Sequence, residues 1–186
     1  MRLIKPSFEI FEQGPGLEGI YEAIERAGRT CYKSKRPEGQ TAKDFVDRMI
    51  KSSHGAMLEH GTVYLKVPNE IVNEGFRFET DWDTLCFNPY TRYSTDCYYY
   101  YYTTNYRVII EHNLQEVLKY LCEPTEYHEK RVTVRFTTSN GIMRELTRHR
   151  SHSFAVESTR YCNYSKNKFN NEITFIKHCY KYIAIN

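Results

Sequence analysis

The sequence predicts an α+β fold with a mainly antiparallel sheet and flanking helices. Apolar residues recur at helical spacing over 16–30 and 41–55, whereas apolar and polar residues alternate over 8–12 and 62–67. These segments do not follow the repeated strand–helix–strand order of a parallel sheet, and no internal repeat is visible. A chain of 186 residues is long enough to bury a core, so we expect a single domain.

The helix expected over 41–55 has start and stop signals in its sequence. Thr41 is suited to cap its N-terminus, and Gly55 is suited to end it. The elements expected in the rest of the chain are, in order, a strand over 106–112, a short helix over 113–124 ended by Pro124, a strand over 131–138, a helix over 139–150 that begins near Ser139 or Asn140, and an extended segment over 157–165.

The composition limits the classes of function. The net charge of +3 favours anionic ligands without implying a nucleic-acid partner. No apolar stretch is long enough to span a membrane and the N-terminus lacks the apolar region of a signal peptide, so we expect a cytoplasmic protein without a membrane partner. The six cysteines include no C-x-x-C pair and are expected to be reduced, small buried side chains.

Two motifs are interpreted as structural. The segment GPGLEG (14–19) matches G-x-G-x-x-G, but an amphipathic strand precedes it and no further strand–helix–strand unit follows, so we expect a turn and a glycine helix start. His54, Glu59 and His60 form a conceivable metal site. Their spacing does not match H-E-x-x-H, and histidines are common near helix ends, so no metal is predicted.

The chain contains 17 tyrosines, and five of them are consecutive, at 98–102. Such a run, followed by an arginine, can stack bases in a single-stranded nucleic-acid-binding protein. The alternative is an aromatic-rich edge strand or a subunit interface, since tyrosine combines an apolar ring with a polar tip. We favour the alternative.

Cations and hydroxyl groups are concentrated in RHRSHSFAVESTRY, from Arg148 to Tyr161. Arg148 and Arg150 at a helix end complement its dipole, which would be a sufficient structural role. However, Arg144 and Arg148 would share a helix face, and Ser158 and Arg160 would share a strand face. A phosphorylated ligand between helix and strand would bind both sets.

The segment RHRSHSFAVESTR resembles the R-H-R-x7-S-x-R motif of the flavin-dependent thymidylate synthases. Residues 27–32 (AGRTCY) and 54–67 (HGAMLEHGTVYLKV) resemble further segments of that family in the same order, and 68–130 resembles an insertion found in one branch. The resemblance implies a flavin-dependent thymidylate synthase-like fold and the reductive methylation of dUMP to dTMP, a step of nucleotide biosynthesis. Methylenetetrahydrofolate would supply the carbon and FAD, reduced by NADPH, the hydride. A homotetramer with shared active sites is also implied.

The same resemblance assigns residues to two ligands. Those implied to bind FAD are Arg148, His149, Arg150, His54, Ala56 and Val156. Those implied to bind dUMP are Glu145, Arg148, Glu157, Ser158, Thr159 and Arg160. Glu59 is implied to support the FAD-binding segment. No residue is assigned a catalytic role.

From about Lys177 the sequence no longer resembles the family, whose members continue with a helical region. We therefore expect an incomplete catalytic domain. Three functions remain open: the enzyme, an inactive truncated remnant of it, and a basic, tyrosine-rich single-stranded nucleic-acid-binding protein. The last is disfavoured because the basic residues concentrate in one segment that has acidic neighbours.

Overall fold

The computed structural model describes residues 2–75, 81–158, 162 and 173–177, and the structural statements below concern these residues. In chain order the elements are β1 (Arg2–Ile4), β2 (Ser7–Phe11), α1 (Gly16–Tyr32), α2 (Ala42–Lys51), α3 (Gly55–Leu58), β3 (Thr62–Pro68), α4 (Asn69–Gly75), α5 (Asp81–Phe87), β4 (Arg92–Thr95), β5 (Tyr99–Asn105), α6 (Tyr106–Glu111), the 3₁₀-helix η1 (Gln115–Tyr120), β6 (Thr133–Thr137), α7 (Asn140–Leu146) and β7 (Thr174–Ile176).

The described strands form three small sheets. β3, β5 and β4 form an antiparallel sheet with β5 in the middle, β2 pairs antiparallel with β6, and β1 pairs in parallel with β7. Mixed helices and small, mainly antiparallel sheets confirm the α+β class. The sequence analysis did not predict the parallel β1–β7 pair, because strands of three residues carry almost no periodicity.

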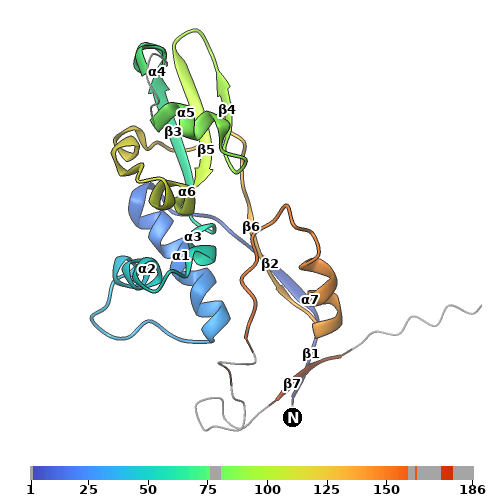
Figure 1. Ribbon diagram of the computed structural model, residues 1–186. Coiled ribbons are helices and arrows are strands. Elements are labelled where there is room, and N and C mark those ends of the chain that lie inside the picture. The colour runs from blue at the N-terminus through green and yellow to red at the C-terminus, as the bar shows by residue number, and fades with distance from the viewer. Residues whose placement is uncertain (1, 76–80, 159–161, 163–172, 178–186) are drawn as a thin grey trace, which may run out of the picture.

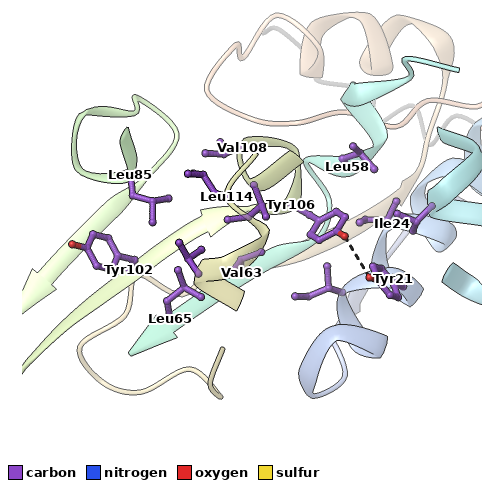
Figure 2. Close-up of a cluster of buried hydrophobic side chains, with 14 of the residues drawn as sticks. Tyr21, Ile24, Leu58, Val63, Leu65, Leu85, Tyr102, Tyr106, Val108 and Leu114 are labelled. Atoms are coloured by element: carbon purple, nitrogen blue, oxygen red, sulfur yellow. Dashed lines mark hydrogen bonds between the residues drawn. The ribbon is translucent and has the colours of Figure 1, made fainter. Parts of the chain in front are cut away.

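The hydrophobic core joins the β3–β5–β4 sheet to the helices at one end of it (Figure 1). Ile24 of α1, Val63 and Leu65 of β3, Tyr102 of β5 and Ile109 of α6 are all fully buried. Figure 2 shows Tyr21 and Tyr106 meeting at the junction, where their hydroxyl oxygens are 3.4 Å apart. Helices α1, α2, α3 and α6 therefore pack around the same apolar cluster as the three-stranded sheet.

The starts of α1 and α2 follow from local sequence. Thr41 caps α2 as predicted: its hydroxyl accepts a hydrogen bond from the Asp44 backbone N–H at 3.2 Å, and the Asp44 carboxylate accepts one from the Thr41 N–H at 2.8 Å. At α1, a Cβ atom on Gly19 would lie 1.8 Å from the carbonyl oxygen of Gly14. The interpretation of GPGLEG as a turn and a glycine helix start is confirmed.

Several elements differ from the sequence prediction. The predicted strand 106–112 is helix α6, because Asn105 caps it by accepting a hydrogen bond from the Val108 N–H at 3.1 Å. The predicted helix 113–124 is reduced to η1, whose chain continues into an isolated bridge between Leu121 and Leu65. Gly55 begins α3 rather than ending α2, which stops at Lys51.

The predicted helix 139–150 is also shorter than expected, since α7 ends at Leu146. Arg148 and Arg150 therefore follow the helix, and Arg148 does not share a helix face with Arg144. The α7 helix has no buried residue, so no apolar contact with the core extends it to Arg150.

The tyrosine run lies in the centre of a sheet, not at its edge. Tyr101 and Tyr102 of β5 are buried, and Tyr102 stacks on Trp82 with a ring separation of 5.9 Å. Tyr101 stacks on Tyr127 at 4.7 Å on the other face. The prediction of an edge strand was wrong, because β4 and β3 cover the two sides of β5.

The β2–β6 pair, the β1–β7 pair and α7 lie to one side of the core (Figure 1). Phe8 pairs with Phe136 and Ile10 with Val134, so these four side chains share one face of β2–β6. Phe8, Ile10 and Phe136 are 68%, 59% and 55% exposed. The apolar face of this two-stranded sheet therefore has no cover within the described part of the chain.

Among the described residues, no helix is long and apolar enough to cross a membrane.

Candidate functional site

The three segments singled out by the family resemblance meet in space. The backbone N–H of Ser158 donates to the carbonyl oxygen of Cys31 at 3.0 Å, and the N–H of Val156 donates to the Cys31 sulfur. Cys31 in turn lies 3.9 Å, sulfur to sulfur, from Met57 of α3. The C-terminal end of α1, the α3 segment and residues 156–158 therefore form one region.

His54 and Ala56 lie on the solvent side of this region. His54 occupies the position before α3, and its Nδ1 is 3.3 Å from the Tyr32 hydroxyl and 3.4 Å from the Ser52 hydroxyl. Both His54 and Ala56 are exposed. These two predicted cofactor residues are therefore accessible to a ligand that approaches the end of α1.

Glu59 connects this region to α6. Its Oε1 accepts a hydrogen bond from Nη1 of Arg107 at 2.6 Å, and its Oε2 accepts one from the Ser153 hydroxyl at 2.5 Å. Arg107 also donates from Nε to Glu111 at 2.7 Å. Hydrogen bonds to Glu111 and Glu59 raise the pKa of Arg107 above its usual value. Glu59 therefore joins the end of α3 to α6 and to the segment that follows the R-H-R triplet.

A small polar cleft lies beside Glu59 and Arg107. It is lined by Glu59, Asn88, Tyr90, Asn105, Arg107, Val108, Glu111 and His112. Sequence reasoning missed Arg107, because 106–112 was predicted to be a strand. The Arg107–Glu111 spacing of four residues would have been the signal for an ion pair on a helix.

The R-H-R triplet follows α7 and faces solvent. Arg148 forms an ion pair with Glu145 at 3.1 Å, and Arg148, His149 and Arg150 are all exposed. The His149 ring meets the His152 ring edge-on, with centroids 6.4 Å apart. Within the described residues, no hydrogen bond or ion pair joins this triplet to His54. The structure therefore shows no polar contact between these two parts of the predicted cofactor set within the described residues.

The predicted substrate residues are only partly described. Glu157 is exposed and lies 3.4 Å from the Lys33 ammonium group, and Ser158 is held to Cys31 through its backbone. Thr159 and Arg160 lie outside the described residues, and so does most of the extended segment predicted over 157–165.

Two partly buried groups near the site have pKa values that burial shifts. Burial raises the pKa of the Cys31 thiol, so this cysteine is not an activated nucleophile. Burial also lowers the pKa of His60, whose Nε2 has no hydrogen-bond partner among the residues that the structure describes. No group of three or more His, Cys, Asp or Glu in the described ranges is placed to hold a metal ion. Glu59, the carboxylate of the conceivable metal site, is engaged by Arg107 and Ser153 instead.

The donors present are suited to an anionic cofactor. Arg148, His149 and Arg150 offer exposed N–H groups, and guanidinium groups bind phosphate oxygens in a bidentate manner. This donor chemistry fits the pyrophosphate of FAD.

One comparison with known proteins gave a match. A family model described as thymidylate synthase complementing protein matches residues 102–183, which include α6, α7 and the R-H-R triplet but not His54 or Ala56. The matched range is somewhat less than half of the chain. No significant match is found among curated proteins or solved structures, so the family-like fold stays a prediction. Residues 102–183 thus carry the sequence pattern of this family, which confirms the resemblance to the flavin-dependent thymidylate synthases and supports a thymidylate synthase-related function.

Proposed function

We propose that this protein catalyses the reductive methylation of dUMP to dTMP as an FAD-dependent thymidylate synthase. Methylenetetrahydrofolate would be the carbon donor and NADPH the reductant of the flavin. The observation that carries the proposal is the family match over 102–183, which contains the complete R-H-R-x7-S-x-R motif. The whole chain would serve as one catalytic domain, with 68–130 as an insertion.

The chemistry of the exposed residues supports this proposal. FAD, dUMP and the folate are all anionic, and the triplet Arg148, His149 and Arg150 presents its N–H donors to solvent. When bound, FAD supplies the hydride. The protein would bind and orient the ligands, with the triplet, His54, Ala56 and Val156 on the flavin side. Glu145, Arg148 and 157–160 would lie on the dUMP side.

The proposal is tested by the visible absorption spectrum of the purified protein with added FAD and then dUMP. We expect a flavin band that co-elutes with the protein and shifts with dUMP. A charge-assisted hydrogen bond contributes about 1.5–3 kcal/mol. Arg148→Ala and Arg150→Ala should therefore each weaken FAD binding about tenfold or more.

Lys43→Ala is the matched control, because Lys43 is an exposed cation on α2 whose ion-pair partner is Asp47. It should leave FAD binding unchanged. A protein that takes up no flavin, or arginine variants that bind it as the parent does, would overturn the proposal. Binding of FAD and dUMP without formation of dTMP would favour the alternative of an inactive remnant.

We also propose a homotetramer with shared active sites. Within the described part of one chain no hydrogen bond or ion pair joins the triplet to His54, so a second subunit would complete a site that needs both. The β2–β6 face offers a contact surface, because an isolated two-stranded sheet with exposed Phe8, Ile10 and Phe136 is only marginally stable in water.

Replacing Phe136 with aspartate should therefore reduce the oligomer to smaller species in sedimentation-velocity experiments. A buried charge opposes association, whereas the same change at an exposed residue outside the interface does not. Phe87→Asp is the control, since Phe87 is 83% exposed at the end of α5. If the parent protein sediments as a monomer, or if both variants dissociate equally, β2–β6 is not the interface.

A further inference from the structure

We propose that Arg107 is a positioning residue that holds the segment after the R-H-R triplet in place through Glu59 and Ser153. Arg107 lies in the 68–130 insertion, Glu59 follows α3, and Ser153 follows the triplet. The inference rests on the proposed function, since the positioned segment is the one proposed to bind flavin and nucleotide. It assigns the insertion a role at the site, which neither the motif nor the family match supplies.

The two oxygens of the Glu59 carboxylate bind two different donors. Oε1 accepts from the Arg107 guanidinium at 2.6 Å and Oε2 accepts from the Ser153 hydroxyl at 2.5 Å. Both hydrogen bonds are charge-assisted, because the acceptor is ionised. A carboxylate with both oxygens engaged has a fixed orientation, so the position of Arg107 determines where the Ser153 hydroxyl can bind.

Arg107 is itself anchored to the core. It extends from α6, where Tyr106, Val108 and Ile109 are buried, and its Nε donates to Glu111 at 2.7 Å. A Cβ atom on Gly55 would lie 3.3 Å from the Arg107 Nε, so the absence of a side chain at Gly55 gives the guanidinium its space beside α3. The hydrogen bonds from Arg107 to Glu59 and from Ser153 to Glu59, here called the relay, therefore start from a rigid element.

The segment held by Ser153 has little other support. Residues 151–154 are exposed and belong to no helix or strand. Among the described residues, the Ser153–Glu59 hydrogen bond is the one side-chain hydrogen bond that ties 148–155 to the body of the protein. Without it, the polar contacts of the described residues would hold the segment through α7 on one side and through the contacts of 156–158 with Cys31 and Lys33 on the other.

Trypsin provides a direct test, because it cleaves after exposed arginines, and Arg148 and Arg150 lie just before Ser153. We expect Ser153→Ala and Arg107→Gln each to increase the rate of cleavage after Arg150 about fivefold, as the loss of one hydrogen bond predicts. The double variant should be cleaved no faster than the faster single variant, because both changes break the same relay. Mass spectrometry identifies the cleavage sites.

Glu111→Gln is the matched control, since it removes the charge of the other partner of Arg107 and leaves Glu59 and Ser153 unchanged. It should alter cleavage after Arg150 much less than Arg107→Gln. Ser153 is exposed, so Ser153→Ala will fold even if Arg107→Gln does not. Unchanged cleavage in Ser153→Ala, or additive effects in the double variant, would overturn the relay.

A second readout separates positioning from general stability. Ser153→Ala should weaken FAD binding about fivefold and reduce the dUMP-induced shift of the flavin band, while the melting temperature stays that of the parent. If the parent binds no flavin, the proposed function fails and the proteolysis still decides the relay. If the parent binds flavin and Ser153→Ala binds it equally with the same shift, the positioning role is wrong.

Discussion

Replacing Glu25 with alanine is expected to lower the free energy of unfolding by about 3 kcal/mol. Glu25 is 4% exposed on α1, and its carboxylate accepts hydrogen bonds from Arg29 at 2.7 Å and from Nε of Arg36 at 2.8 Å. Removing the carboxylate leaves the largely buried Arg29 without its charge partner. This loss of stability is at the lower end of the range for breaking a buried ion pair, because Arg36 is partly exposed to solvent.

Urea unfolding of the parent and the variant measures this effect. Glu22→Ala is the matched control, because Glu22 is exposed on the same helix, and we expect a change of about 0.5 kcal/mol or less. Equal losses for the two variants would show that helix propensity, and not the buried ion pair, determines the result.

The same residue predicts a dependence on pH. Burial raises the pKa of Glu25, but hydrogen bonds from Arg36 and Arg29 outweigh burial and hold the pKa below its usual value of 4.5. The contribution of Glu25 is therefore complete above pH 4.5 and is lost as the pH falls through the lowered pKa of the folded state. The difference in stability between the parent and Glu25→Ala should shrink below pH 4.5. A constant difference down to pH 3 would contradict this assignment.

Replacing Tyr102 with alanine should lower the free energy of unfolding by about 3–5 kcal/mol, the range for a large aromatic side chain in a core. Tyr102 is fully buried in the middle of β5 and stacks on Trp82 and Tyr100 at ring separations of 5.9 and 6.0 Å. Its hydroxyl lies 3.5 Å from the Cys86 sulfur. The alanine variant would leave a cavity between the sheet and α5.

Two variants separate the causes of this loss in urea unfolding. Tyr102→Phe keeps the ring and should cost about 1 kcal/mol, the contribution of one hydrogen bond. Tyr98→Ala removes a tyrosine of the same run that is 75% exposed, and it should change the free energy of unfolding by about 0.5 kcal/mol or less. A large loss of stability in Tyr98→Ala, or a small one in Tyr102→Ala, would show that the tyrosine run does not contribute to the core in this way.

That role also bears on the alternative of a single-stranded nucleic-acid-binding protein. Bases would have to stack on exposed aromatic faces. Tyr100 and Tyr102 stack on each other, and Tyr101 stacks on Tyr127. Tyr100, Tyr101 and Tyr102 therefore use their rings within the protein, whereas Tyr98 is exposed, and this disfavours the run as a stacking surface for bases.

Local signals were sufficient for some elements and not for others. The Thr41 cap and the glycine start of α1 were predicted because their hydrogen bonds and close contacts lie within five residues. The apolar stretch 106–112 was assigned the wrong type, because a short apolar run fits a buried strand as well as a helix. The cap at Asn105, which decides between the two, was overlooked.

The central position of β5 was not accessible to sequence reasoning. Edge and central strands can have the same composition, and only the pairing of Tyr99–Asn105 with both β3 and β4 distinguishes them. The length of α7 was also decided by its surroundings, since helices this short depend on packing and α7 has no buried residue.

By itself the sequence determined the α+β class and the family pattern around Arg148–Arg150, because these depend on periodicity and on a contiguous motif. Only the tertiary structure decided that residues 156–158 meet Cys31 and that Ser153 meets Glu59, 94 positions earlier in the chain. The reason is that side-chain hydrogen bonds between distant residues leave no periodic trace. Their geometry exists only after the core has placed α1, α3 and α6 side by side.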